Sequence, residues 1–196
     1  MRIVVSSSNK DKLAEIQAIL GNDYELVTKA EAGYADVEVE ENGKTLEENA
    51  SLKARAIYEL TKENVLADDT GIFVEYLNGR PGVYAARYAG EGCSYKDNVE
   101  KMLDELNDAK DISQRKAYFE TAICFITEAG DEHFTIGRMH GYIGFEPKGS
   151  HGFGYDPIFI PKGETISLSE MTENEKNKIS HRARAIQNFK EMLRDL

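Results

Sequence analysis

Two adjacent acids, Asp68 and Asp69, follow the apolar run Val65-Leu66-Ala67. Carboxylate oxygens, together with substrate phosphate, are the ligands that Mg²⁺ prefers. Because neighbouring residues of a strand point to opposite faces, the two acids should have different roles, one on a metal and the other facing elsewhere or acting on water. Glu40 and Glu41, in an earlier acidic stretch, could complete the site. The alternative interpretation is a pair of solvated turn acids.

A polar segment, residues 6–9, separates the β-branched run Ile3-Val4-Val5 from a stretch of helical periodicity. A loop between a strand and a helix presents backbone N–H groups and the positive end of the helix dipole, which together bind anions. Lys12 in the first helical turn could add positive charge. The segment is not a Walker A loop, so the nucleotide interpretation is weak by itself. Alternatively, Ser8 or Asn9 only caps the helix.

The segment Gly149 to Pro157 combines three glycines with two aromatic residues and an acid. Glycine permits close backbone approach and positive φ. Phe153 and Tyr155 offer stacking faces, and Asp156 offers an acceptor for base edges, a combination that suits a purine pocket. An aromatic hairpin loop is the structural alternative.

A basic cluster lies near the end of the chain, with Lys176 ahead of Ser180-His181-Arg182. On one continuous helix His181 would point away from the apolar stripe, whereas Ser180 as an N-cap would start a new helix. The second arrangement aims His181, Arg182 and free N–H groups at one place, within reach of Lys176. A solvent-exposed basic cluster remains the alternative.

These residues need strands and helices to position them, and the periodicity predicts both. The capping box Thr45-x-x-Glu48 marks the start of one helix. The pattern predicts helices over residues 13–20, 45–62, 94–106 and 179–193, and strands over 3–5, 65–67, 72–74, 117–126 and 132–139. Strands and helices alternate early and strands cluster late, which favours an α/β fold with a mixed sheet and flanking helices.

The whole-chain composition limits the function. With 196 residues, 41% hydrophobic and 30% charged, we expect a single globular domain over residues 1–196. No apolar run approaches a membrane span and no signal peptide precedes the first strand, so we expect a cytoplasmic protein without a membrane partner. A net charge of -11 disfavours long nucleic acids. The distant Cys93 and Cys124 indicate buried free thiols rather than a redox pair or zinc site.

Seven motifs, in order and nearly end to end, resemble the Ham1/inosine triphosphate pyrophosphatase family. They are S-x-S-N-x-x-K (6–12), E-x-x-G (40–43), E-N-A-x-x-K-A (48–54), A-D-D-T-G (67–71), P-G-V-Y-A-A-R-Y (81–88), G-F-G-Y-D-P-I-F (152–159) and E-K-N-x-x-S-H-R (175–182). Each motif is weak or moderate alone, but seven in the right order are very improbable by chance.

The resemblance implies roles for particular residues. Glu40 matches a magnesium ligand, although the adjacent Glu41 leaves the register open by one, and Asp69 matches the residue that is both proton acceptor and metal contact, with Asp68 supporting the same site. The implied substrate-binding residues are Ser7, Ser8, Asn9, Lys12, Lys53, Thr70, Phe153, Gly154, Tyr155, Asp156, Lys176, His181 and Arg182. The role of Arg87 stays open.

The implied fold is an elongated mixed β-sheet split between two lobes, with flanking helices, around a central active-site cleft. The implied activity is Mg²⁺-dependent hydrolysis of non-standard purine nucleoside triphosphates (ITP, dITP, XTP) to monophosphate and pyrophosphate, by a homodimer. The alternatives are a general or modified-pyrimidine (Maf-like) nucleotide pyrophosphatase and a non-catalytic nucleotide-binding regulator. The order of preference among substrates, replacement of Mg²⁺ by Mn²⁺ and the dimer surface stay open.

Overall fold

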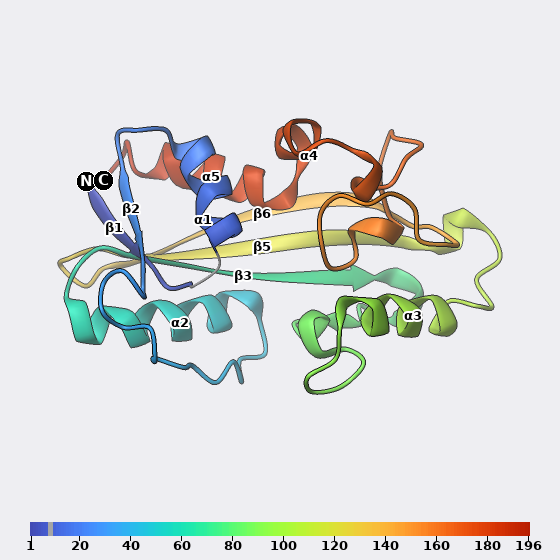
Figure 1. The fold of residues 1–196 in the computed structure, drawn as a ribbon, viewed down its shortest axis with the longest axis horizontal. Helices are drawn as coiled ribbons and strands as arrows, with labels where there is room; N and C mark the ends of the chain where they lie inside the picture. Colours follow the sequence, from blue (N-terminus) through green and yellow to red (C-terminus); the bar gives the residue numbers. More distant parts are fainter. Residues whose placement is uncertain (8–9) are drawn as a thin grey trace. The chain divides into compact units, whose positions relative to one another are not determined.

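The computed structural model describes residues 1–7 and 10–196. Within these residues the chain forms a seven-stranded sheet of order β2-β1-β3-β5-β6-β7, with β4 beside β3. The strands are β1 (Arg2–Val5), β2 (Glu25–Thr28), β3 (Val65–Val74), β4 (Pro81–Gly82), β5 (Lys116–Ile126), β6 (Glu132–Ile143) and β7 (Phe159–Pro161). The α-helices are α1 (Lys10–Leu20), α2 (Leu46–Thr61), α3 (Tyr95–Glu105), α4 (Glu173–Ile179) and α5 (His181–Met192), as Figure 1 shows.

The sheet is mixed, as predicted. Strand β1 is parallel to both β2 and β3, with Val4 in register with Val27 and Val65. Strand β4 is antiparallel to β3, and β7 is antiparallel to β6. The α/β fold class is therefore confirmed.

The chain divides into two compact units. Unit 1 comprises residues 1–69, 121–137 and 182–196, and unit 2 comprises residues 70–120 and 138–181. Strands β3, β5 and β6 each contribute residues to both units. The expected single domain and the expected cleft stay predictions.

Unit 1 has a sheet covered on both faces. Along β1, Ile3 and Val5 pack into a core with α1 and α5, whereas Val4 packs into a second core with α2. The same alternation runs along β3, where Leu66 joins the first core and Ala67 the second. Strands buried on both faces consist of continuous apolar runs, which explains why β1 lacks polar alternation. Figure 1 shows α1 and α5 on one side of these strands and α2 on the other.

Helix α2 begins where the sequence predicted. The Thr45 side chain accepts a hydrogen bond from the Glu48 N–H at 3.1 Å, and Lys62 ends the helix in the left-handed region. The expected capping box is only half formed, because the Glu48 carboxylate accepts from the N–H of Lys44 rather than of Thr45. The helix start therefore depends on a single side-chain cap.

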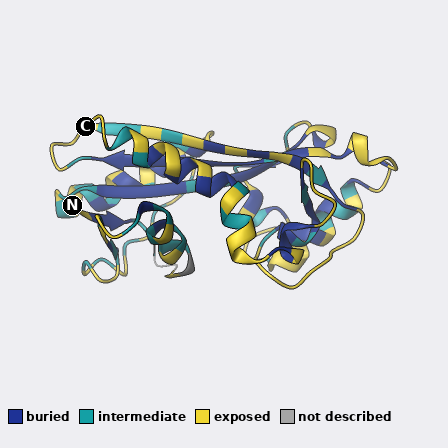
Figure 2. Ribbon diagram, turned by 90° about the horizontal axis from the view of Figure 1, so that it is seen from above, coloured by how far each residue is buried: buried dark blue, intermediate teal, exposed yellow. Residues whose placement is uncertain are grey.

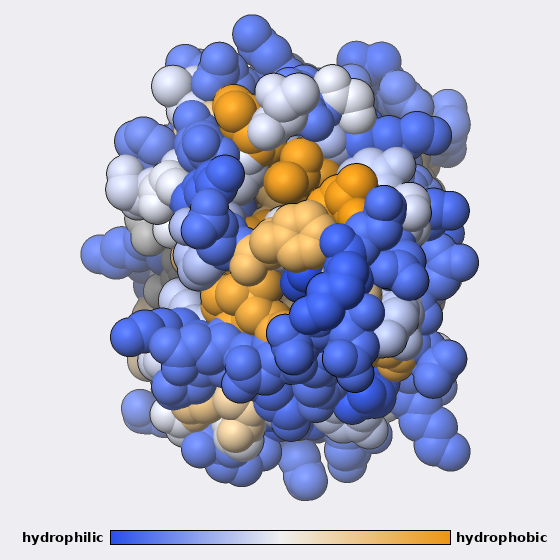
Figure 3. Space-filling model, turned by 90° about the vertical axis from the view of Figure 1, so that its right-hand side faces the viewer, coloured by the Kyte–Doolittle hydropathy of each residue, from blue (hydrophilic) through white to orange (hydrophobic). Residues whose placement is uncertain are grey.

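Unit 2 buries one face of its sheet. Ile72 and Val74, Ala117 and Phe119, and Met139 and Ile143 pack with α3 and the irregular segment after β6. Figure 2 shows buried strands and exposed outward sides of the helices. Figure 3 shows hydrophobic residues grouped within a largely hydrophilic face.

The two cysteines differ in burial. Both are free, but only Cys124 is buried, while Cys93 is half-exposed.

The helical pattern near the end of the chain breaks at Ser180, as predicted, because its extended conformation (φ -64°, ψ 153°) separates α4 from α5. No helix in the described part of the chain is long and apolar enough to cross a membrane.

Candidate functional site

The two adjacent acids of β3 lie on opposite faces of the sheet in unit 1. Asp68 points to the face covered by α1 and α5, where Lys12 Nζ lies 2.9 Å and Arg182 Nε 3.6 Å from its carboxylate oxygens. Asp69 points to the face covered by α2, where it contacts Lys53 Nζ at 3.0 Å and Asn49 Nδ2 at 3.2 Å. The strand alternation thus gives the two acids different partners.

Asp68 is a buried, ionised counter-ion. Burial by itself would raise its pKa, but the charges of Lys12 and Arg182 outweigh burial and hold the pKa of this carboxyl well below its usual range. Because both carboxylate oxygens face cations, Asp68 does not lie with the oxygens of Asp69. This geometry does not support its predicted role as a metal ligand.

Asp69 has the properties of a general base. Burial, reinforced by the negative charge of Glu41, raises the pKa of Asp69 to about 6, although Lys53 acts in the opposite direction. A carboxylate with a pKa near neutrality accepts a proton more readily than an exposed aspartate does.

Glu41, rather than Glu40, lies beside Asp69. The segment 37–44 alternates between partly buried and exposed residues, and Glu41 falls on the inward side while Glu40 is exposed. The Glu41 carboxylate lies 2.8 Å from Lys53 Nζ, which also contacts Asp69. Because an extended chain directs neighbouring side chains to opposite sides, only one of Glu40 and Glu41 can point towards Asp69. The structure therefore places Glu41 beside Asp69, whereas the predicted ligand Glu40 points outward.

A magnesium ion fits this donor set. The carboxylates of Glu41 and Asp69 both contact one ammonium group, that of Lys53. No group of three or more His, Cys, Asp or Glu suited to a metal occurs among residues 1–7 and 10–196. Mg²⁺ commonly uses one or two carboxylates and completes its shell with water and substrate phosphate.

Lys53 is the central cation of this cluster. Burial would lower its pKa, but Asp69, Asp68 and Glu41 outweigh burial and raise it. The ammonium group therefore stays charged and could contact a phosphate, as predicted.

The predicted phosphate loop is only partly described. Ser8 and Asn9 lie outside the described residues. Ser7 is half-buried and its N–H donates to the Val5 carbonyl at 2.7 Å. Ser6 Oγ donates to the Lys53 carbonyl at 2.9 Å, which ties the end of β1 to α2. Lys12 lies in the first turn of α1, where the sequence placed it.

A second cluster, in unit 2, is built on the glycine-rich segment. The buried Asp156 carboxylate contacts Lys176 Nζ at 2.7 Å and accepts from the Phe153 N–H at 3.1 Å. Lys176 Nζ lies 5.0 Å from the centre of the Phe153 ring. Phe153 is 44% exposed, and its ring centroid lies 6.0 Å from that of Tyr95.

The other aromatic residue of the segment is structural. Tyr155 is only 5% exposed, and its hydroxyl donates to the Ala85 carbonyl at 2.6 Å. The prediction that Tyr155 offers a stacking face is therefore wrong, because its ring is enclosed in the core of unit 2. Asp156 is likewise engaged by Lys176, so its predicted contact with a base edge would compete with an ion pair.

Two glycines shape the same segment, both with positive φ. Gly152 has φ +74°, and a Cβ there would lie 2.1 Å from Asp156 Oδ2. Gly154 has φ +62°, but a Cβ there would meet no other atom within 4 Å. Only Gly152 is thus required by both conformation and close contact.

His181 and Arg182 have separate surroundings. The buried His181 ring stacks on Phe119 in unit 2, with centroids 4.8 Å apart and an interplanar angle of 21°. Arg182, in unit 1, contacts Glu15 at 2.6 Å as well as Asp68. The structure therefore does not show the pair aimed at one place. Of the other predicted residues, Thr70 is half-buried, and Arg87 lies over the Tyr84 ring and beside Glu91.

Two participants in the unit 1 cluster were missed by the sequence interpretation. Glu15 lies three residues after Lys12 on α1, and Asn49 lies four residues before Lys53 on α2. Residues three or four apart share a helix face, and this spacing was the signal that could have found both.

Asn49 connects the acids to the loop before α2. Its side-chain amide donates to Asp69, and its side-chain oxygen accepts from the Gly43 N–H at 2.8 Å. A Cβ on Gly43 would lie 2.6 Å from that oxygen. The buried Asn49 therefore holds the segment that carries Glu41 close to Asp69.

Comparison with known proteins places this arrangement in a family. The model of the Ham1 family matches residues 3–192. The chain belongs to the Ham1 family.

Relatives and solved structures agree with this membership in the Ham1 family. The dITP/XTP pyrophosphatase of Thermoanaerobacter pseudethanolicus is 44% identical over 97% of this chain and 95% of its own. That of Bacillus subtilis is 43% identical over 97% of this chain and 96% of its own. The Ham1 protein of Staphylococcus aureus has a TM-score of 0.89 at 36% identity, covering 100% of this chain and 99% of its own. For the HAM1 protein of Coxiella burnetii the TM-score is 0.90 at 36% identity, with 100% of both chains covered. The family resemblance seen in the sequence is thus confirmed.

Proposed function

We propose that this Ham1 family chain hydrolyses non-standard purine nucleoside triphosphates such as ITP, dITP and XTP to the monophosphate and pyrophosphate. The observation that carries the proposal is the partly buried Asp69 with its raised pKa, which contacts Lys53 and Asn49 while Lys53 also contacts Glu41. Relatives that are 43% and 44% identical are named dITP/XTP pyrophosphatases, which supports the substrate class.

The reaction is attack of water on the α-phosphorus with pyrophosphate as leaving group. Asp69 accepts the proton of the attacking water. Lys53 and Lys12 offset the negative charge of the triphosphate and hold its orientation. No covalent intermediate with the protein is required.

Glu41 and Asp69 are the residues that would hold a magnesium ion, and Mg²⁺ is our proposed cofactor. When bound, it supplies positive charge that neutralises the phosphate oxygens. Lys53 now contacts both carboxylates, so its ammonium group is already near the position where phosphate oxygens would arrive.

Selection of the base is assigned to unit 2. The exposed Phe153 ring offers a stacking surface, and Lys176 beside it presents only hydrogen-bond donors. A 6-oxo purine offers an acceptor to such a donor, whereas the amino group of adenine would leave the donor unsatisfied. Thr70, His181 and Arg182 are retained as proposed substrate neighbours.

The remaining parts of the proposal concern the setting of the enzyme. We place it in the cytoplasm as a homodimer that acts on free nucleotides. Its net charge of -11 agrees with a small-molecule substrate rather than a long nucleic acid.

A substrate panel tests the function. Pyrophosphate release from ITP, dITP, XTP and ATP would be measured with Mg²⁺ and with EDTA. We expect kcat/KM for ITP or XTP to exceed that for ATP by about 10²-fold or more, and EDTA to stop turnover. In Asp69→Asn we expect kcat to fall by about 10²- to 10⁴-fold while the protein stays folded.

Each alternative predicts a different result in the same panel. Equal rates with ITP and ATP would indicate a general nucleotide hydrolase, and a preference for modified pyrimidine nucleotides would indicate Maf-like activity. Calorimetric binding of ITP without hydrolysis would indicate a regulator. Wild-type turnover in Asp69→Asn would refute the assignment of the base.

A further inference from the structure

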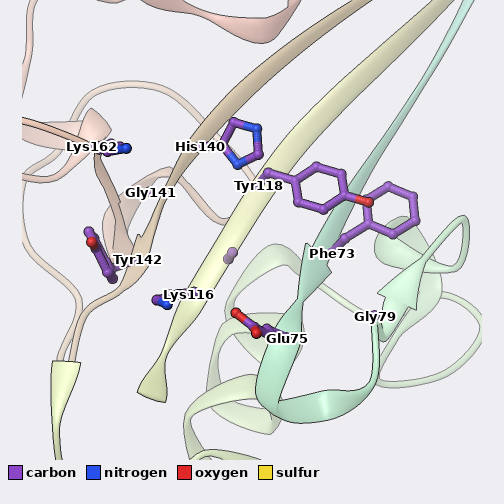
Figure 4. A pocket seen from close by; sticks show the side chains of 10 residues that line it. Phe73, Glu75, Gly79, Lys116, Tyr118, His140, Gly141, Tyr142 and Lys162 are labelled. Atoms are coloured by element: carbon purple, nitrogen blue, oxygen red, sulfur yellow. The ribbon is translucent and has the colours of Figure 1, made fainter. Parts of the chain in front are cut away.

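Aromatic rings of unit 2 form two groups outside its core. The first lies on the open face, the face of β3, β5 and β6 that turns away from that core. There the Phe73 and Tyr118 rings are stacked, with centroids 4.9 Å apart and planes inclined by 11°, and the His140 ring follows 5.4 Å from Tyr118. Figure 4 shows the three rings in a row across the strands. Because all three residues stand on paired strands, the sheet fixes their positions.

The second group is the pair Tyr95 and Phe153, whose ring centroids lie 6.0 Å apart with planes inclined by 41°. Tilted aromatic rings at such a separation attract each other beyond the effect of the area that they bury. Both residues are exposed, Tyr95 by 58% and Phe153 by 44%. Phe153 differs from the rings of the open face, because it stands on an irregular segment rather than on a strand.

The segment that carries Phe153 gives the ring little support of its own. Phe153 lies between Gly152 and Gly154, which both have positive φ. Glycine leaves the backbone more conformational freedom than other residues do, and ordering a side chain only when a ligand arrives lowers affinity. Lys176 Nζ, 5.0 Å from the ring centre, and the Tyr95 ring both contact Phe153 and restrict its orientation.

Tyr95 stands on a rigid support. It is the first residue of α3, and a capping box fixes the start of this helix. The Ser94 hydroxyl accepts from the Asp97 N–H at 3.2 Å, and the Asp97 carboxylate accepts from the Ser94 N–H at 2.7 Å. In the same turn the buried Asn98 accepts from the Ala89 N–H at 2.8 Å, which joins the helix to the preceding loop. The backbone therefore presents the Tyr95 ring in a fixed place.

We propose that Tyr95 is a positioning residue for base recognition, whose ring orients the Phe153 ring against which the purine stacks. This inference rests on the function proposed above, in which Phe153 contacts the base. The Tyr95 hydroxyl forms no hydrogen bond with any residue in the ranges 1–7 and 10–196. The ring, rather than the hydroxyl, therefore makes the contact, and Tyr95 acts through Phe153.

The position of Tyr95 predicts which kinetic constant depends on it. Tyr95 and Phe153 belong to unit 2, whereas the proposed base Asp69 and the phosphate-binding Lys53 belong to unit 1. A change at Tyr95 should weaken binding of the purine and leave the chemical step intact. The expected result is a higher KM at constant kcat.

Steady-state pyrophosphate release from ITP tests the proposal. In Tyr95→Ala we expect KM to rise about 2- to 10-fold, the range that one aromatic pair contributes, while kcat changes by less than about 2-fold. Tyr95→Phe keeps the ring and should behave as wild type. Tyr76→Ala makes the same change at a 42% exposed tyrosine of unit 2 and should also behave as wild type. Thermal melts would establish that all variants are folded.

Two further measurements separate positioning from other roles. In a Phe153→Ala background, Tyr95→Ala should cause no further rise in KM, because Tyr95 acts through the ring that is already absent. Inorganic triphosphate, which has no base, should inhibit wild type and Tyr95→Ala with the same inhibition constant. Additive effects on KM would show that Tyr95 acts independently of Phe153, and a changed inhibition constant would show a general disturbance. Either result would overturn the proposal.

The kinetic results also distinguish this inference from the proposed function. A wild-type KM in Tyr95→Ala together with a raised KM in Phe153→Ala would refute the role of Tyr95 and leave base selection by Phe153 standing. A raised KM in Tyr95→Phe would assign the effect to the hydroxyl and refute the role of the ring. Wild-type KM values in both alanine variants would refute base selection by Phe153 itself. Absence of pyrophosphate release from ITP in wild type would overturn the proposed function and this inference together.

Discussion

At the residue scale, Asp68 and Asp69 show how position alone separates two identical side chains. Both are largely buried, and burial raises the pKa of a carboxyl group. Asp68 faces two cations and keeps a low pKa, whereas Asp69 shares one cation with Glu41 and has a pKa raised to about 6. One acid thereby serves as a permanent anion, and the other is suited to accept a proton.

Asn49 gives a prediction at the same scale. Asn49→Ala removes the donor to Asp69 and the acceptor for the Gly43 N–H. Leaving buried polar groups unsatisfied costs about 1–3 kcal/mol. We therefore expect kcat/KM for ITP to fall by about 10-fold or more, because Glu41 is no longer held beside Asp69. Steady-state pyrophosphate release and a thermal melt would be measured together.

The matched control is Asn42→Ala, an exposed asparagine of the same loop, which should behave as wild type. Equal activity of the Asn49 and Asn42 variants would show that Asn49 does not position the acids.

Part of this residue-level arrangement could be predicted from the sequence. Strand periodicity predicted that Asp68 and Asp69 would differ, but not which of them would meet the cations of α1 and α5. Glu40 and Glu41 could not be separated, because the segment before α2 lies outside any helix or strand and its direction depends on the Asn49–Gly43 hydrogen bond. Tyr155 was misread because its hydroxyl partner, Ala85, is distant in sequence.

At the element scale, the glycine-rich segment of unit 2 depends on one close contact. Gly152→Ala would place a Cβ 2.1 Å from Asp156 Oδ2 and add the strain of a positive φ. We expect this variant to displace Phe153 and Lys176, so that KM for ITP rises about 10-fold or more while kcat changes less.

Gly154→Ala is the matched variant, because it carries only the strain of positive φ, about 1 kcal/mol, with no contact to break. Substrate titrations of both variants with ITP would measure the difference. Equal KM values would contradict the importance of the Gly152–Asp156 contact.

Elements with local signals were predicted, and elements that depend on distant partners were not. The Thr45 cap and the break at Ser180 are local, and both occur as expected. Strands β2 and β7, four and three residues long, were not predicted from the sequence. Pairing with β1 and β6 makes them strands.

At the scale of the whole molecule, the buried ion cluster around Asp68 predicts sensitivity to acid. The pKa of Asp68 is lower in the folded chain than the value of about 3.9 in an unfolded chain. Its stabilising contribution is therefore complete above that value and is lost as the pH falls through the lower pKa of the folded state. Asp68→Asn should lower the free energy of unfolding by about 3 kcal/mol at pH 7.

Unfolding in guanidinium chloride at pH 7 and at pH 2.5 would check this prediction. The difference in the free energy of unfolding between wild type and Asp68→Asn should be smaller at pH 2.5. Asp104→Asn, at an exposed position of α3, should show no difference at either pH. A constant difference at both pH values would exclude Asp68 as a source of acid sensitivity.

The fold class and the family were accessible from the sequence because seven motifs occur in one order along nearly the whole chain. The open face of unit 2 was not, because Phe73, Tyr118 and His140 come from three strands far apart in sequence. Only strand order and register bring their rings into one row.

Neither unit is a continuous stretch of chain. The polypeptide passes between them after Asp69, Glu120, Gly137 and His181, so unit 1 is assembled from three segments and unit 2 from two. No single truncation point or proteolytic nick can therefore release either unit intact, and no one contiguous gene fragment encodes a whole unit.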